Sequence, residues 1–171
     1  DTIQSRGLGD VYKRQNIHQV DNGITGECLV LITPDHERTM YTHLGVSSQL
    51  NIEDINQGVI KDSEYLLVEG YLVTSEETMN VASYSMDIAT KHGVKKIITL
   101  SDPNVVKFFR DNILELLNKT FDIIFCNKQE ALNVSKSNNI DDAIDFLKKY
   151  AHEIIITCGE DGAYVTIGSE K

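Results

Sequence analysis

The chain has 171 residues, of which 41% are hydrophobic and 25% are charged, and its formal net charge is −10. This composition is typical of a globular domain with one core. So acidic a chain does not suit nucleic-acid binding, which needs a basic face. No apolar run approaches the roughly 20 residues of a membrane helix, and residues 1–15 lack the apolar stretch of a secretory signal. We therefore expect a cytoplasmic protein that binds neither nucleic acid nor membrane.

Residues 1–15 show neither helical nor strand periodicity. They resemble translated sequencing-adapter sequence, so they are left out of the fold prediction. On this interpretation residues 16–171 are part of a larger native domain. No closing element precedes Lys171, so we also expect native sequence beyond it.

Two strand candidates, residues 28–33 and 38–43, are separated by the turn residues Pro34 and Asp35. Their spacing predicts a β-hairpin within about residues 25–45. Residues 52–59 predict a short helix, which begins a second region that extends from about residue 52 to residue 171.

In this second region, short apolar runs alternate with amphipathic helical patterns. Strands are predicted at residues 65–68, 97–100, 122–126, 153–157 and 163–167. Helices are predicted at residues 76–92, 103–118, 129–135 and 139–150, with Ser75, Asp102 and Asn139 as candidate N-caps. Short continuous apolar runs are typical of parallel strands buried on both faces. The order predicts a three-layer α/β fold, Rossmann-like, with a mostly parallel sheet and helices on both faces.

Ligands of open α/β sheets bind beyond the carboxyl ends of the strands. Polar segments follow three predicted strands there, namely Ser101–Asp102, Asn127–Glu130 and Gly159–Gly162. A carboxylate at Glu130 could hold hydrated Mg²⁺ together with phosphate oxygens. Alternatively, Asn127 and Glu130 form a helix-capping pair, and their spacing alone favours capping.

The segment Gly159–Gly162 also has two interpretations. Its backbone amides could approach a nucleotide phosphate, or it could simply close a hairpin, which the local Asp-Gly pattern favours. The five histidines have no metal-site spacing, and Cys28, Cys126 and Cys158 form no Cys-x-x-Cys pair, so reduced thiols are expected. Arg38 opens a strand, where a solvated residue is the ordinary case.

Five segments in a fixed order resemble the ribokinase-like (PfkB-type) carbohydrate kinases and, within them, the adenosine kinase-like branch. The segment from Thr25 to Asp35, followed by Arg38-Thr-Met, is similar to that branch's lid hairpin. Val68-Glu-Gly-Tyr-Leu72 is similar to the strand end beside the substrate, and Leu100-Ser-Asp-Pro103 is similar to the next strand end. Phe125-Cys-Asn127-Lys-Gln-Glu130 is similar to the family's Asn-x-x-Glu motif. Thr157-Cys-Gly159-Glu-Asp-Gly162 is similar to its nucleotide-site turn.

This resemblance implies a ribokinase fold with a small lid hairpin. It also implies a kinase that uses ATP and Mg²⁺ to phosphorylate a hydroxymethyl group of a sugar or nucleoside, either adenosine or a ribose-like compound. By the same resemblance, Asn127 and Glu130 organise Mg²⁺ and its water, with Glu130 acting through water. Thr157, Gly159 and Gly162 are expected to line the nucleotide site. Arg38 is expected to close over the phosphates, and Cys28 and Gly70 to lie on the substrate side.

Two segments of the family do not occur in the chain. The Gly-Ala-Gly-Asp segment, whose aspartate takes the hydroxyl proton, is expected beyond Lys171, and a di-glycine substrate segment is expected upstream of Asn16. The chain by itself is therefore expected to be inactive, and its parent to be a monomer or a homodimer formed through the lid. Two alternatives stay open: a fructose or keto-deoxy sugar kinase of the same fold, or a non-catalytic nucleotide- or sugar-sensing module.

Overall fold

The computed structural model describes residues 23–36 and 38–168. The chain divides into two units, one up to Ser47 and one from Ser48 onward. The predictions for residues 1–15 lie outside the described residues. Among the residues described, no helix is both long and apolar enough to span a membrane.

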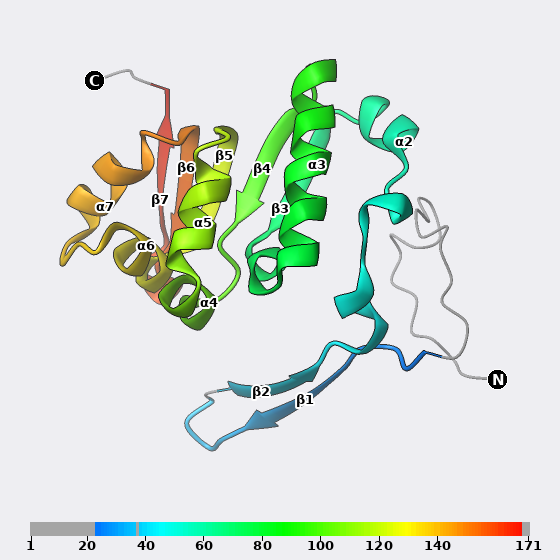
Figure 1. Cartoon of the computed structure of the whole chain (residues 1–171). Helices are drawn as coiled ribbons and strands as arrows, with labels where there is room; N and C mark the ends of the chain where they lie inside the picture. Colours follow the sequence, from blue (N-terminus) through cyan, green and yellow to red (C-terminus); the bar gives the residue numbers. More distant parts are fainter. Residues whose placement is uncertain (1–22, 37, 169–171) are drawn as a thin grey trace. The chain divides into compact units, whose positions relative to one another are not determined.

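The first unit contains an antiparallel β-hairpin of strands β1 (Glu27–Ile32) and β2 (Arg38–His43) (Figure 1). In its register Ile32 lies opposite Arg38. All described residues of both strands are exposed, including large apolar side chains on each strand. The predicted hairpin is therefore confirmed, as a ribbon that buries neither of its faces within its own unit.

The second unit contains a five-stranded sheet in the order β3-β4-β5-β6-β7 (Figure 1). Its strands are β3 (Tyr65–Glu69), β4 (Lys95–Thr99), β5 (Phe121–Asn127), β6 (Ala151–Thr157) and β7 (Ala163–Ile167). The pairs from β3 to β6 are parallel, and β7 returns antiparallel to β6. The predicted α/β fold class with a mostly parallel sheet is confirmed.

Helices lie before the first strand of this sheet and between its successive strands. They are α2 (Gln57–Lys61), α3 (Glu76–His92), α4 (Pro103–Phe108), α5 (Arg110–Leu117), α6 (Lys128–Ser135) and α7 (Ile140–Leu147), with the short 3-10 helices η1 (Gly45–Gln49), η2 (Ile52–Asp54), η3 (Gly70–Thr74) and η4 (Gly159–Asp161). The predicted N-caps are confirmed, since Ser75, Asp102 and Asn139 each accept hydrogen bonds from first-turn amides. These bonds satisfy donors that the helix itself leaves unpaired.

One predicted helix, residues 103–118, is two helices in the structure. The break lies at Phe109, whose φ of −118° and ψ of 31° interrupt the helical path between α4 and α5. Tertiary hydrogen bonds orient the second segment: Arg110 Nε donates to the carbonyl of Val134 at 2.8 Å, and Asn112 Nδ2 donates to that of Val73 at 3.0 Å. A helical pattern in the sequence contains no information about such distant acceptors.

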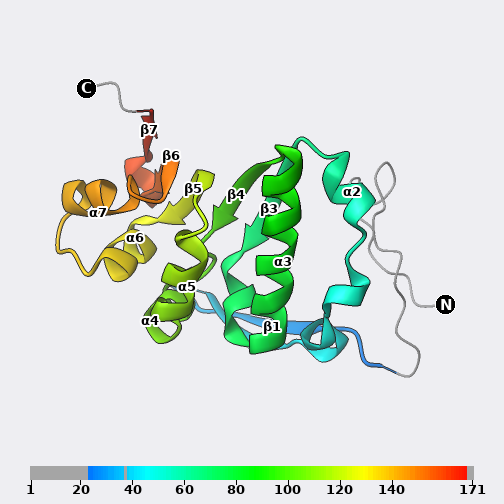
Figure 2. The same cartoon turned by 45° about the horizontal axis from the view of Figure 1, so that its top comes forward.

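The core lies between the sheet and one layer of helices. The row Val68, Ile98, Ile124 and Ile154 is in register across four strands, and each side chain is at most 2% exposed. Helices α3, α5, α6 and α7 lie on this side of the sheet (Figures 1 and 2). This burial of branched side chains is the main source of stability for the second unit.

The opposite face of the same sheet is open within the second unit. Its apolar residues include Leu67 and Val165, each 57% exposed, and Phe125, which is 37% exposed. None of the described helices of this unit covers them. Within the described part of the second unit, helices therefore cover one face of the sheet, whereas the sequence predicted a three-layer arrangement with helices on both faces.

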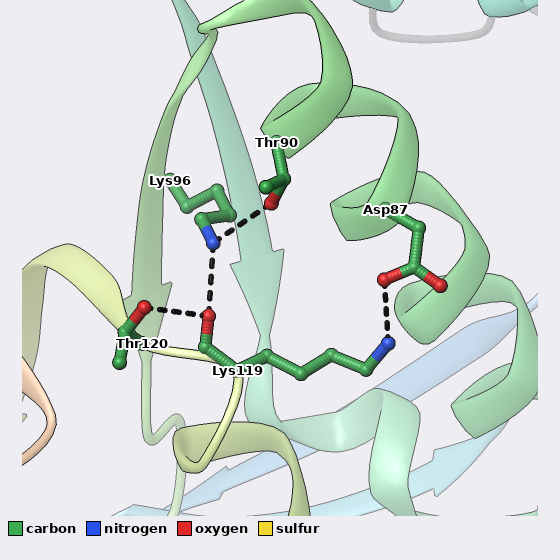
Figure 3. Close-up of polar contacts among 5 residues, drawn as sticks. All are labelled: Asp87, Thr90, Lys96, Lys119 and Thr120. Atoms are coloured by element: carbon green, nitrogen blue, oxygen red, sulfur yellow. Dashed lines mark hydrogen bonds and ion pairs between the residues drawn. The ribbon is translucent and has the colours of Figure 1, made fainter.

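A buried lysine lies at the amino end of β4. Lys96 is 9% exposed, and its ammonium group donates to Thr90 Oγ1 at 3.0 Å and to the carbonyl of Lys119 at 2.9 Å (Figure 3). Asp122 accepts from the Lys96 backbone N–H at 2.7 Å. Burial lowers the pKa of Lys96, and the negative charge of Asp122 opposes this effect. The cluster lies at the end of the strands opposite to the one where ligands of such sheets bind.

Candidate functional site

The carboxyl ends of β4, β5 and β6 meet at one edge of the sheet. Thr99 lies beside Phe125, and Asn127 lies beside Thr157, in the parallel registers. An open pocket of about 240 Å³ at this edge is lined by Thr99, Phe125, Cys126, Asn127, Glu130 and Thr157. The structure thus brings together Asn127, Glu130 and Thr157, three residues that the sequence predicted for the site.

Asn127 and Glu130 form a reciprocal capping box at the start of α6. The Glu130 carboxylate accepts from the Asn127 backbone N–H at 2.9 Å and from its side-chain amide at 2.7 Å. In return, the Glu130 backbone N–H donates to Asn127 Oδ1 at 2.8 Å. The capping interpretation of this spacing is therefore confirmed, and the same bonds hold the carboxylate at the pocket wall.

Glu130 is unusual because a carboxylate rarely lies so deep without a cation beside it. It is 4% exposed, and among the described residues no lysine or arginine forms an ion pair with it. Burial raises the pKa of Glu130, the hydrogen bond from the Asn127 backbone N–H lowers it, and the nearby charge of Asp102 raises it again. A cation in the pocket would offset this uncompensated negative charge.

These residues fit a hydrated divalent cation better than a fully protein-ligated one. In the part of the chain that the structure describes, no three His, Cys, Asp or Glu side chains gather in a way that could hold a metal ion. Mg²⁺ is commonly held by one or two carboxylates while it keeps several waters and binds substrate phosphates. Glu130 supplies one such carboxylate, and the pocket beside it has room for ordered water.

Cys126 lies in the pocket wall but is not a candidate nucleophile. It is 5% exposed, and burial is the largest cause that raises the pKa of its thiol, followed by the charges of Glu130 and Cys158. A thiol rather than a thiolate is therefore present at neutral pH, and only the thiolate is strongly nucleophilic. We assign Cys126 a packing role.

The predicted glycine turn follows Thr157 directly. Its hairpin interpretation is confirmed, because the turn joins β6 to the antiparallel β7, and the Cys158 N–H donates to the Gly162 carbonyl at 2.8 Å. Gly162 has a φ of 87° and a ψ of −135°, a conformation that favours glycine. Gly159 and Gly162 do not line the pocket, but they follow one of its lining residues within five positions.

Gly70 has a packing reason to be glycine. A Cβ at Gly70 would lie 2.6 Å from the carbonyl oxygen of Leu100, and the Gly70 N–H donates to Ser101 Oγ at 2.9 Å. Ser101 itself has a positive φ of 72°, which a non-glycine residue rarely adopts. The Gly70–Ser101 bond joins the carboxyl ends of β3 and β4 and gives Gly70 a structural role. Its predicted role on the substrate side stays a prediction.

Arg38 and Cys28 lie on the hairpin of the first unit. Arg38 begins β2, and Cys28 on β1 is exposed, with its sulfur accepting from Thr42 Oγ1 at 3.4 Å. Their predicted roles at the phosphates and the substrate stay predictions.

The sequence prediction missed Thr99, Phe125 and Cys126 as pocket residues. A usable signal was available, since each lies within two positions of a polar segment that follows a strand. Asp102, at the neighbouring strand end, accepts from the Asn104 N–H at 2.6 Å as the cap of α4.

Comparisons with known proteins identify the relatives of the chain. A family model described as pfkB family carbohydrate kinase matches residues 13–171. The crystal structure of adenosine kinase from Sinorhizobium meliloti aligns with a TM-score of 0.80 and 33% identity, over 85% of this chain and 45% of that one. A probable sugar kinase from Rhizobium etli CFN 42 aligns with a TM-score of 0.79 and 30% identity, over 85% and 44%.

A more distant structure, a putative ribokinase II from E. coli in complex with ATP and Mg²⁺, aligns with a TM-score of 0.72 and 17% identity, over 84% of this chain and 48% of that one, and shows the same fold. A comparison with curated protein sequences finds no match. The chain spans less than half the length of each of these three structures.

Proposed function

The chain belongs to the pfkB family of carbohydrate kinases, and on this premise we propose that its parent protein transfers the γ-phosphate of ATP to a hydroxymethyl group of a sugar or nucleoside. The observation that carries the proposal is the buried Glu130 carboxylate, without a cation partner among the described residues, in a pocket at the carboxyl edge of the sheet. That edge is where open α/β sheets bind their ligands.

Asn127 and Glu130 act together in the proposed mechanism. Phosphoryl transfer depends on positioning and on stabilising negative charge, and Mg²⁺, when bound with ATP, supplies much of that stabilisation. Glu130 would hold the hydrated cation through its water ligands, which suits its uncompensated charge. Asn127 fixes the carboxylate with its two hydrogen bonds, so that little reorganisation is needed when the cation arrives.

The nucleotide and the acceptor would be bound by neighbouring groups. Thr157 lines the pocket, and the turn containing Gly159 and Gly162 would offer backbone amides to the nucleotide phosphates. We propose that Arg38 stabilises the transferred phosphate from the hairpin, and that Cys28 and Gly70 contribute to the substrate side. The sequence identity of the chain to an adenosine kinase, 33%, is close to its identity to a probable sugar kinase, 30%. The proposal therefore covers both nucleoside and sugar acceptors, and the sugars include fructose and keto-deoxy sugars.

Transfer also needs a group that accepts the hydroxyl proton. The sequence contains no Gly-Ala-Gly-Asp segment, so we propose that this chain alone transfers no phosphate and that the parent supplies the aspartate elsewhere. The parent is proposed to be cytoplasmic. We propose that the parent is either a monomer or a homodimer formed through the hairpin, whose apolar side chains are exposed.

The test is an activity assay on the purified full-length parent with ATP, Mg²⁺ and a panel of acceptors that includes adenosine, ribose and fructose. We expect ADP release that depends on one acceptor and a product phosphorylated at its hydroxymethyl group, while the 171-residue chain gives only background. If the parent binds ATP or a sugar but never turns over, the non-catalytic sensing module is the better account. Turnover by the short chain would contradict the proposed need for a further aspartate.

A further inference from the structure

A second pocket lies among helices α4, α5 and α6, and its volume is about 410 Å³. It shares no lining residue with the pocket at the strand ends. Its polar lining consists of three cationic side chains and three amide side chains: Lys107, Arg110, Lys136, Asn104, Gln129 and Asn133. The volume lies within the range of small-molecule sites.

The positive charge of this pocket stands out in an acidic chain with a net charge of −10. No carboxylate lines it, although Asp102 and Asp111 are close in sequence, and Asp102 Oδ1 is engaged as the α4 cap. Among the described residues, none of the three cations of the pocket forms an ion pair, whereas Lys119 and Lys148 elsewhere on the surface do. The pocket therefore holds a concentration of uncompensated positive charge.

Hydrogen bonds between the helices hold the pocket walls in place. Asn133 Nδ2 donates to the Pro103 carbonyl at 3.1 Å, which ties α6 to α4. Within α6, Gln129 Nε2 donates to Asn133 Oδ1 at 2.9 Å and so orients the Asn133 side chain. Arg110 Nε donates to the Val134 carbonyl at 2.8 Å, and its guanidinium group lies 6.0 Å from the centre of the Phe146 ring. The half-buried Arg110 is thereby oriented through Nε, which leaves its two terminal nitrogens available to a ligand.

We propose that this second pocket binds a small phosphate-bearing anion that carries at least two negative charges. A guanidinium fork and two ammonium groups match the geometry and charge of phosphate oxygens. The three amide side chains supply further donors and can also accept from hydroxyl groups. Two sources share this recognition chemistry, namely the free anion, as phosphate or pyrophosphate, and the phosphate of a larger metabolite.

The site is separate from the proposed transfer of phosphate. Its residues come from the outer helical layer, and Gln129, Asn133 and Lys136 belong to the same helix, α6, that carries Glu130. A ligand in the second pocket would contact the helix that holds the buried carboxylate, without needing ATP or Mg²⁺. Binding to the second pocket can thus be measured whether or not the parent is a kinase.

The experiment is an NMR titration of the ¹⁵N-labelled chain, without Mg²⁺, using inorganic phosphate, pyrophosphate and ribose 5-phosphate as three separate probes. We expect saturable shifts of the side-chain amide signals of Asn104, Gln129 and Asn133, and binding that weakens as salt is added. Tighter binding of ribose 5-phosphate than of phosphate would identify a phosphorylated metabolite, and tighter binding of pyrophosphate would identify the free anion. Both results support the site.

The variant Lys107→Gln/Lys136→Gln should weaken binding by about tenfold or more, or about 1.4 kcal/mol. Both lysines are exposed, so the variant should keep its fold, which its melting curve and backbone spectrum check. The matched control Lys91→Gln/Lys148→Gln removes the same charge from exposed positions outside the pocket. Shifts confined to Asn127 and Thr157, equal weakening in the control, or no saturable shift with any probe would overturn the proposal.

Discussion

Asn127 and Glu130 exchange hydrogen bonds in both directions, so that one side chain caps α6 while the other is held at a buried pocket wall. The two interpretations of the spacing, capping and ligand binding, are therefore compatible. A capping box fixes the carboxylate, and no lysine or arginine among the described residues forms an ion pair with it, so a cation in the pocket could offset its charge.

Glu130→Gln should change how stability depends on pH. Because burial raises the pKa of Glu130 in the folded state, ionised Glu130 destabilises the fold above that pKa. In the wild type this cost disappears as pH falls through the pKa of Glu130 in the folded state towards its pKa in the unfolded state. Glutamine cannot titrate and loses about one hydrogen bond, since its NH₂ group would face the Asn127 amide.

The measurement is a pair of urea unfolding curves for wild type and Glu130→Gln at about pH 7 and about pH 4.5. All other groups titrate in both proteins, so the difference between them isolates Glu130. We expect the wild type to gain stability relative to the variant as pH falls. A constant difference, or one of the opposite sign, would show that burial does not govern this carboxylate.

The buried Lys96 should show the mirror-image behaviour at alkaline pH. Its folded-state pKa is lowered by burial, so the charged form carries a cost at neutral pH. That cost is relieved as pH rises through the folded-state pKa towards the ordinary lysine value. The free energy of unfolding of wild type should therefore rise relative to Lys96→Met between about pH 7 and about pH 10, and a flat difference would contradict the burial effect.

The charge of Asp122 should matter only while Lys96 is present. Asp122→Asn keeps an acceptor for the Lys96 N–H but removes the negative charge that opposes the burial penalty. We expect a loss of about 1–3 kcal/mol in the wild-type background. In the Lys96→Met background the loss should be much smaller, because no buried positive charge remains for Asp122 to offset. The Lys119 carbonyl keeps a donor in that background, since Thr120 Oγ1 donates to it at 2.8 Å. Equal losses in both backgrounds, measured by urea unfolding, would rule out this coupling.

Two cysteines should differ sharply in their reaction with a thiol reagent such as DTNB. Cys28 is exposed, whereas Cys126 is buried and its pKa is raised. We expect Cys28 to react at least roughly 100-fold faster than Cys126 in the folded chain. Cys28→Ser should remove the fast phase, and urea should make Cys126 reactive. A fast phase that survives Cys28→Ser and is lost in Cys126→Ser would contradict the structure.

The uncovered sheet face should make the chain associate with itself. Leu67 and Val165 are each 57% exposed on that face, and contiguous exposed apolar surface promotes association. Leu67→Lys/Val165→Lys should weaken self-association in sedimentation experiments by about tenfold and reduce binding of the dye ANS. The control Phe108→Lys changes an apolar residue that is 72% exposed on the helical side, and it should have a much smaller effect. Equal effects of the two variants would show that the open sheet face does not drive self-association.

Most of the elements could be predicted from the sequence, because buried strands and capped helices have local signals. The apolar run at residues 65–68 became β3 within one residue, and Ser75 caps α3 as predicted. The early start of β6 at Ala151 could not be predicted, since it depends on pairing with Phe121 across the sheet. The break at Phe109 likewise depends on acceptors in distant elements.

The site was partly predictable for the same reason. Glu130 was found because it follows a strand end at capping spacing, which is a local pattern. Thr99 and Cys126 were missed although each lies within two positions of a polar segment that follows a strand. Which of the residues near these segments reach the pocket depends on the register of neighbouring strands, such as Thr99 beside Phe125. Arg38 and Cys28 belong to a separate unit, so their predicted roles depend on the parent protein.

The most direct test of the proposed role of Glu130 is the dependence of kcat on Mg²⁺ concentration in the full-length parent. Glu130→Gln should lower kcat by about tenfold or more at limiting Mg²⁺, or about 1.4 kcal/mol of barrier, with partial rescue by added Mg²⁺. The control Glu115→Gln removes an exposed carboxylate on α5 and should match wild type. Identical Mg²⁺ curves for wild type and Glu130→Gln would contradict the proposed role of this carboxylate.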